Sequence, residues 1–152
     1  MTSDDLKRIV AERAVDDYVK DGMKVGLGTG STAYHAIRRV GRLVRENGYN
    51  LTCVATSSGT EGLAREYGID TVSINEVGHL DVTIDGADEV DPEMQLIKGL
   101  GGALLREKIV AAASRQEIIV VDESKKVDVL GTRAPLPVEV LAFGHPFVKT
   151  AL

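Results

Sequence analysis

Aromatic residues are scarce in this sequence: only 4% of the 152 residues are aromatic, and none is tryptophan. Surfaces that stack unpaired nucleotide bases on aromatic rings are therefore not expected. The net charge is −5 and no Lys/Arg-rich run offsets it, which argues against duplex nucleic acid and anionic membranes as partners. No apolar run approaches the roughly 18 residues of a transmembrane helix. The N-terminal segment MTSDDLKRIV is acidic where a signal peptide is basic, so we predict neither export nor membrane insertion.

Cysteine is nearly absent as well. The lone Cys53 can form no internal disulfide and has no companion at a metal-ligand spacing, so we expect a core residue of a reducing, cytoplasmic protein. The three histidines show neither a ligand spacing nor a Ser or Cys partner pattern. We therefore predict no metal site and no hydrolytic triad.

The remaining composition is typical of one folded β/α domain over residues 1–152. Hydrophobic residues make up 43% of the chain and charged residues 27%, while 16 glycines provide tight turns. The length suits a single hydrophobic core.

Strand-like and helix-like segments alternate along the chain. Strands are expected at residues 24–28, 51–56, 70–74, 80–85, 117–121 and 138–141. Helices are expected from Ser3, as N-cap, to a stop at Gly22, and from Ala33 up to Gly48. Two more are expected over 60–67 and 103–114. This order predicts an α/β fold: an open, mostly parallel Rossmann-like sheet, with helices on both faces and the strand 117–121 near its centre. Loops that follow the strands then meet at one edge of the sheet, where ligands bind.

The first such loop is Gly28-Thr29-Gly30-Ser31-Thr32. Its glycines, its hydroxyls and the N-terminus of the following helix suit a phosphate group. It lacks the Lys of a Walker loop, and Ser31 stands where a dinucleotide fingerprint needs its last Gly, so a nucleotide is disfavoured. The alternative, that Ser31 merely caps the helix, stays open at this point.

The second loop carries Asp85 and Asp88 on either side of Gly86-Ala87. Two neighbouring carboxylates push one pKa up and can exchange protons with substrate hydroxyls. An Asp turn or a helix N-cap is the structural alternative. A Ca²⁺ loop fails because Ala87 and Val90 stand where an oxygen ligand and a glycine are required.

The third loop places Lys98 before the glycine-rich segment 99–102, where its ammonium can reach a developing oxyanion. Glu107 lies nine residues on, in the helix that this segment introduces, and we expect both to face one pocket. Flanked by basic residues, Glu107 is otherwise an ordinary solvated helix charge. Lys125 follows the strand 117–121 at the same sheet edge, whereas Lys7 lies on the polar side of the first helix.

Six segments together resemble ribose-5-phosphate isomerase type A in order and spacing, over nearly the whole chain. They are GLGTGSTA from Gly26, DGADE from Asp85, IKG from Ile97, REKI from Arg106, the Asp122-x-Ser-Lys125 segment and PLPVEV from Pro135. The resemblance implies the fold superfamily shared with the CoA transferases. It also implies interconversion of D-ribose 5-phosphate and D-ribulose 5-phosphate in the pentose phosphate pathway, through an enediolate and without metal or organic cofactor.

The resemblance also implies residue roles. Glu107 matches the general base, Lys98 and its following N–H groups match the segment that stabilises the enediolate, and Asp85 and Asp88 match the pair that binds sugar hydroxyls and helps to open the ring. The other implied substrate contacts are Thr29, Gly30, Ser31, Thr32, Gly86, Ala87, Gly99, Leu100, Gly101 and Lys125. A cytoplasmic homodimer or homotetramer is expected.

Two departures from the family are visible. Leu100 stands where many relatives have Gly, which predicts a reshaped pocket wall. Family members also continue past PLPVEV into a small α/β domain that this chain is expected to lack. The competing interpretations are a sugar-phosphate sensor, which would have lost the base and would carry a DNA-binding motif, and an acyl-CoA transferase relative.

Overall fold

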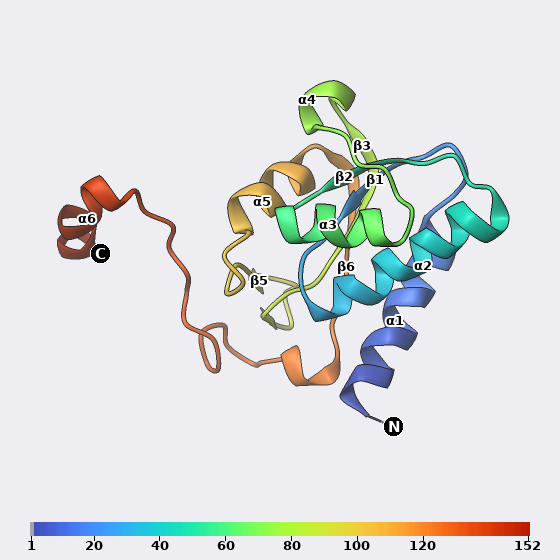
Figure 1. Cartoon of the computed structure of the whole chain (residues 1–152). Helices are drawn as coiled ribbons and strands as arrows, with labels where there is room; N and C mark the ends of the chain where they lie inside the picture. The colour runs from blue at the N-terminus through green and yellow to red at the C-terminus, as the bar shows by residue number, and fades with distance from the viewer. Residues whose placement is uncertain (1) are drawn as a thin grey trace.

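A computed structural model describes residues 2–152, in which helices and strands alternate along the chain (Figure 1). The strands are β1 Lys24–Leu27, β2 Thr52–Ala55, β3 Leu80–Asp85, β4 Glu89–Val90, β5 Leu96–Ile97 and β6 Ser114–Ile119. The α-helices are α1 Ser3–Tyr18, α2 Ser31–Asn47, α3 Ser58–Glu66, α4 Ile74–Val77, α5 Leu104–Ala112 and α6 His145–Ala151. Two 3₁₀ turns, η1 Glu123–Lys125 and η2 Ala142–Gly144, complete the elements. Between Thr2 and Leu152, no helix is long and apolar enough to cross a membrane.

The four long strands form one parallel sheet in the order β2-β1-β3-β6, and β4 and β5 form a small antiparallel pair. This arrangement confirms the predicted α/β class with a mostly parallel sheet. The expected central position of 117–121 is wrong, because β6 begins at Ser114 and pairs only with β3 at the edge. The apolar run Ile118–Val121 indicated a strand buried on both sides, but half of this run lies beyond the last paired residue.

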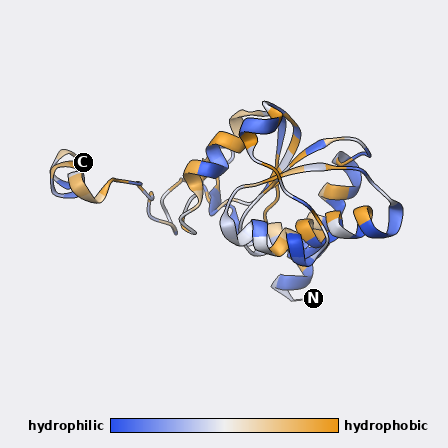
Figure 2. Ribbon diagram, turned by 45° about the horizontal axis from the view of Figure 1, so that its top comes forward, coloured by the Kyte–Doolittle hydropathy of each residue, from blue (hydrophilic) through white to orange (hydrophobic). Residues whose placement is uncertain are grey.

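Helices cover both faces of the sheet. On one face, Val15 of α1 and Ile37 of α2 share a buried cluster with Val25 and Val82 of the central strands. On the other face, Val110 of α5 packs with residues of β2 and β3. Figure 2 shows the strands meeting at the centre of the molecule, with helices arranged around them. The predicted loops begin at the carboxyl ends of β1 and β3.

The predicted core position of Cys53 is confirmed. The side chain is fully buried in β2 within the α1/α2 cluster, and it forms no disulfide. Burial raises the pKa of its thiol to about 12, so the thiolate form is suppressed at neutral pH.

The N-cap of helix α1 lies one residue before the expected one. Thr2 is the N-cap and forms a capping box with Asp5, so Ser3 is the first helical residue rather than the cap. The helix ends at Tyr18, four residues before Gly22, because the chain turns extended at Val19 to bury that side chain.

Two predicted strands are absent from the described structure. Within 70–74, only Thr71 makes a single bridge, to Cys53, and Ser73 then caps the short helix α4 through a capping box with Glu76. Residues 138–141 form no strand, because no neighbouring strand lies beside them to pair with. The segment continues to α6, which Figure 1 shows well away from the sheet, and Phe143 there is fully exposed.

Candidate active site

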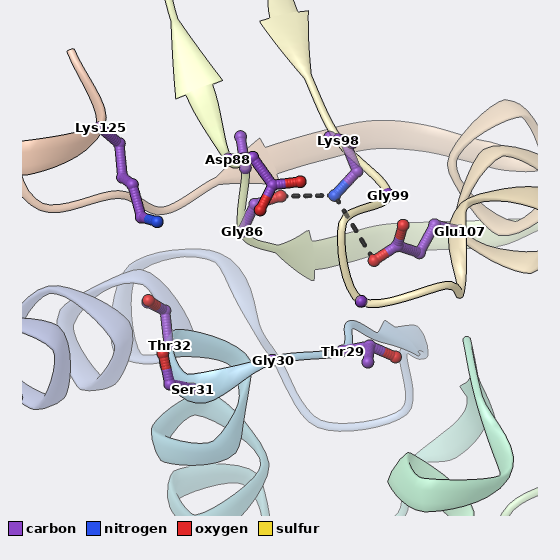
Figure 3. A pocket seen from close by; sticks show the side chains of 12 residues that line it. Thr29, Gly30, Ser31, Thr32, Gly86, Asp88, Lys98, Gly99, Glu107 and Lys125 are labelled. Carbon is purple, nitrogen blue, oxygen red and sulfur yellow. Dashed lines mark hydrogen bonds and ion pairs between the residues drawn. The ribbon is translucent and has the colours of Figure 1, made fainter. Parts of the chain in front are cut away.

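The loops that follow β1, β3 and β5 meet at the carboxyl edge of the sheet and enclose a cavity of about 200 Å³ (Figure 3). The cavity is lined by Thr29, Gly30, Ser31, Thr32, Gly86, Ala87, Asp88, Lys98, Gly99, Gly101, Glu107 and Lys125. Two of the residues expected here do not line it. Asp85 is buried behind Lys98, and the side chain of Leu100 is exposed outside the cavity. The structure therefore brings together twelve of the fourteen sequence-predicted positions, with Asp85 directly beneath them.

The N-terminus of α2 forms one side of the cavity. Gly30 is the N-cap residue, at a φ of 112° that favours glycine, and no side chain caps the helix. The alternative that Ser31 serves as the cap is therefore wrong: its Oγ instead accepts a hydrogen bond from Lys7 Nζ at 3.0 Å. Free N–H groups, two hydroxyls and an ammonium make this end of the cavity suited to an anion.

The hydroxyl of Thr29 has a different role from the one expected. Its Oγ1 lies 2.7 Å from Thr56 Oγ1, 2.9 Å from Ser57 Oγ and 3.1 Å from Thr60 Oγ1. Thr56 and Thr60 in turn donate to backbone carbonyls of β1 and its loop. We call these four residues the hydroxyl cluster. It fixes the first loop against the end of β2, so Thr29 borders the cavity while its hydroxyl is held by protein.

Asp85, the last residue of β3, is almost completely buried at 1% exposure. Its Oδ1 accepts hydrogen bonds from the backbone N–H groups of Gly86 (2.8 Å) and Thr29 (3.1 Å). Its Oδ2 lies 3.2 Å from Lys98 Nζ. The carboxylate approaches so closely that a Cβ added at Gly28 would lie 2.3 Å from Oδ1. Asp85 therefore joins the first and second loops and holds the Lys98 ammonium.

Lys98 and Glu107 meet at the opposite side of the cavity from α2. Lys98 Nζ donates to the Gly86 carbonyl and lies 3.8 Å from Glu107 Oε1. Figure 3 shows the ammonium between these two groups. Glu107 is only 6% exposed, and its Oε2 has no hydrogen-bond partner among residues 2–152. The interpretation of Glu107 as a solvated surface charge is therefore wrong.

Burial perturbs both carboxylates. It raises the pKa of Glu107, the negative charge of Asp85 raises it further, and the Lys98 ammonium opposes both effects. Burial likewise raises the pKa of Asp85, against the lowering effects of Lys98 and of the two backbone donors. A glutamate that faces a cavity and whose pKa is raised above its ordinary value is a better proton acceptor than a solvated glutamate.

Asp88 and Leu100 connect the second and third loops. The backbone N–H of Leu100 donates to Asp88 Oδ2 at 3.0 Å, and the backbone N–H of Asp88 donates to the Ile97 carbonyl at 2.8 Å. Leu100 therefore takes part through its backbone, and its side chain points away from the cavity lining. This arrangement explains how a residue larger than Gly is accommodated at position 100.

Lysines complete the anion end of the cavity. Lys125 lines it from the short turn η1, which Asp122 caps by accepting from the Ser124 N–H at 2.9 Å. Lys7 reaches the same end from α1, as its contact with Ser31 shows. The sequence did not predict that Lys7 lies at this edge of the sheet. It indicated only that Lys7 is on the polar side of the first helix.

Metal ligation finds little support within the described residues. From Thr2 to Leu152 there is no group of three or more His, Cys, Asp or Glu residues arranged to hold a metal ion. His35 is buried and its Nε2 lies 2.9 Å from Asp4 Oδ1, so it joins α2 to α1.

Comparisons with known proteins show which family this chain resembles. The family model for ribose 5-phosphate isomerase A (phosphoriboisomerase A) matches residues 52–152. The ribose-5-phosphate isomerase A of Jannaschia sp. (strain CCS1) is 52% identical over 149 residues, 98% of this chain and 56% of the relative. That of Rhodopseudomonas palustris (strain HaA2) is 53% identical over 152 residues, 100% of this chain and 64% of the relative.

Solved structures agree as well. The ribose 5-phosphate isomerase from Plasmodium falciparum superimposes with a TM-score of 0.93 at 43% identity, over 97% of this chain and 64% of that one. A D-ribose-5-phosphate isomerase in complex with phospho-erythronic acid has a TM-score of 0.96 at 38% identity, over 100% of this chain and 66% of that one. The chain thus spans between half and two thirds of the length of these relatives, and on this evidence it belongs to the ribose 5-phosphate isomerase A family.

Proposed function

We propose that residues 1–152 act as a catalytic α/β domain that interconverts D-ribose 5-phosphate and D-ribulose 5-phosphate through an enediolate. The observation that carries the proposal is the pairing of Lys98 Nζ with the buried carboxylate of Glu107, 3.8 Å away, at a cavity of about 200 Å³. Family membership supports the same chemistry. The proposed reaction uses protein groups only and needs no metal or organic cofactor.

Glu107 is the proposed general base. In the forward direction its carboxylate takes the proton from C2 of the open-chain aldose, and the electron pair left behind forms the C1–C2 double bond of the enediolate. The same carboxyl then returns this proton to C1, while the hydroxyl proton of O2 is transferred to O1, so that C2=O2 forms and the ketose results with no net change in protons. The raised pKa of Glu107 suits both halves of this transfer, and such a base contributes roughly 10²–10⁴-fold to rate.

Lys98 and the backbone N–H groups of residues 99–101 are the proposed donors to the enediolate oxygens. A fixed ammonium in a water-poor cavity stabilises the negative charge that develops on O1 and O2. Asp85 holds this ammonium at 3.2 Å from its Oδ2, which keeps Nζ at the cavity wall. Asp88, at the cavity surface, is the proposed partner of the sugar hydroxyls during ring opening.

The phosphate is proposed to bind at the N-terminus of α2. Ser31 and Thr32 offer hydroxyls and backbone N–H groups there, and Lys7 and Lys125 supply two positive charges. The reacting carbons then lie at the Lys98 and Glu107 side, so the substrate spans the cavity from phosphate to carbonyl. In this placement the phosphate anchors the substrate, and the carboxylates act on its reacting carbons and hydroxyls.

The sensor and acyl-CoA transferase alternatives are weaker. A sensor needs no buried base beside an ammonium, whereas Glu107 and Lys98 are both present and paired. A cytoplasmic homodimer or homotetramer is part of the proposal, and the exposed apolar side chains of Leu141, Phe143 and Phe147 support self-association. Sedimentation of the purified chain, with a monomer as the contradicting result, tests that part.

The decisive experiment compares the unsubstituted chain with Glu107→Gln in a ribose 5-phosphate conversion assay without added metal. Glutamine is nearly isosteric but cannot accept the proton, so we expect kcat to fall at least about 10²-fold. Glu93→Gln, an exposed position outside the cavity, is the matched control and should keep full activity. No conversion by the unsubstituted chain, or similar turnover in the Glu107→Gln variant, would refute the proposed function.

A further inference from the structure

Helix α5 carries Glu107 but is held loosely by its own apolar residues. Only Glu107 and Val110 are buried among its nine residues, while Leu105 and Ile109 are about half exposed. Its N-cap residue, Ala103, makes no side-chain cap hydrogen bond. The position of the first turn of α5 therefore needs another source of restraint.

Arg106, the neighbour of Glu107, connects α5 to β2 and α3. Its Nη2 donates to the backbone carbonyl of Ala55 at 3.0 Å and to Glu61 Oε1 at 2.7 Å. Ala55 is the last residue of β2, and Glu61 lies in the first turn of α3. Among residues 2–152, no other α5 side chain hydrogen-bonds to a different helix or strand.

The strand end that Arg106 holds also anchors the first loop of the cavity. Thr56 and Ser57 follow Ala55 directly, and both contact Thr29 Oγ1 in the hydroxyl cluster. Glu61 follows Thr60, the fourth member of that cluster. One guanidinium thus joins the helix that carries Glu107 to the backbone that fixes the first loop.

We propose that Arg106 is a positioning residue for Glu107, an inference that rests on the isomerase function proposed above. Glu107 Oε2 has no hydrogen-bond partner within the described chain, and Oε1 has only the Lys98 ammonium, 3.8 Å away. The α5 backbone therefore contributes much of what fixes the carboxylate in place. Arg106 does not line the cavity and touches no substrate position. It acts on the reaction by fixing the first turn of α5 against β2 and α3.

The Arg106 contact is expected to affect the reaction rate much more than the stability of the fold. The Arg106–Glu61 pair is half exposed, with side-chain exposures of 49% and 41%, and exposed pairs contribute little to stability. A displacement of about 1 Å at a reacting group, by contrast, can reduce rate by about 10²-fold. Substitution of Arg106 is therefore expected to lower kcat strongly and the melting temperature only slightly.

The test compares Arg106→Met and Arg106→Lys with Arg65→Met. Arg65 lines the same surface groove as Arg106 but makes no ion pair with any residue from Thr2 onward, so its substitution is a matched control. For Arg106→Met we expect kcat to fall about 10- to 100-fold, with KM and the affinity for phospho-erythronic acid within about twofold. Arg106→Lys, which keeps the charge but not the two-sided contact, should lose less, and Arg65→Met should behave like the unsubstituted chain.

Three results separate the possible failures. If Arg106→Met keeps kcat within about twofold while Glu107→Gln is inactive, the positioning role is wrong and the isomerase function stands. If affinity for phospho-erythronic acid falls in step with kcat, or the melting temperature drops below the assay temperature for Arg106→Met and Arg106→Lys alike, Arg106 has a general structural role and the inference is overturned. If the unsubstituted chain shows no turnover, the proposed function itself fails.

Discussion

Strand β3 carries an aspartate near each end, and the two lie in opposite environments. At the amino end, Asp81 accepts a hydrogen bond from the Lys24 N–H at 2.9 Å and lies 3.6 Å from Arg115, with 26% of its side chain exposed. At the carboxyl end, Asp85 is 1% exposed and shares the Lys98 ammonium with Glu107. One strand therefore carries a solvated, satisfied carboxylate and a buried, crowded one only four residues apart.

The two ends of the strand therefore have different roles. At the amino end the charges are paired next to water, where ion pairs change the stability of the fold only slightly. The carboxyl end gathers Asp85, Lys98 and Glu107 out of water, where burial raises the pKa values of both carboxyls. Folding alone does not favour that arrangement, which indicates that the carboxyl end is shaped by ligand chemistry.

The strongest way to sharpen the comparison is Asp85→Asn. The amide oxygen can still accept from Gly86 and Thr29, but the Lys98 ammonium loses its anionic partner, and we expect kcat/KM to fall at least about 10²-fold. Because the folded site disfavours the ionised carboxyl, the melting temperature should stay the same or rise. A large loss of stability with little loss of rate would contradict this account.

A second prediction concerns pH. The folded-state pKa values of Asp85 and Glu107 lie above their unfolded values, so the stability that their protonated forms contribute is complete below the unfolded pKa and is lost as pH rises through the folded pKa. Over that window, kcat/KM should rise up to about tenfold per pH unit as Glu107 ionises. The free energy of unfolding of the chain should fall relative to that of Glu107→Gln, measured by denaturant unfolding across the window. Parallel pH curves for the two proteins would contradict the assignment.

The smallest effect is expected at the other end of the strand. Asp81→Asn keeps an acceptor for the Lys24 N–H and loses only the exposed pair with Arg115, so stability should fall by about 1 kcal/mol or less. Its kcat/KM should stay within about twofold of the unsubstituted value. A rate loss comparable to that of Asp85→Asn would remove the distinction between the two ends.

Much of the fold was predictable from local pattern. Strands β1, β2 and β3 lie within two residues of their expected limits because each is a short apolar run bounded by polar or glycine residues. The strand expected at 70–74 failed because Ser73 offers a capping box, a local alternative to pairing. Strand order and the edge position of β6 depend on the crossovers between strands, which periodicity does not report.

The site was predictable to the extent that it follows from topology. Loops after parallel strands meet at one edge, which brought Asp88, Lys98 and Glu107 to one cavity. The place of Lys7 beside Ser31 depends on how α1 packs on α2, a contact across 24 residues. The direction of the Thr29 hydroxyl likewise depends on three partners from another strand end. Such long-range contacts leave no trace in the spacing of residues.

The close approach of Gly28 to Asp85 gives position 28 an unusual status. An alanine methyl there would need the space that the carboxylate oxygen already occupies, at 2.3 Å. The smallest possible replacement would therefore displace the acid that steers Lys98, although the backbone conformation of Gly28 is open to any amino acid. The same methyl would lie 2.6 Å from the Ile84 backbone carbonyl. In a saturation library of this chain, position 28 should therefore be depleted under selection for expression as well as under selection for enzymatic activity.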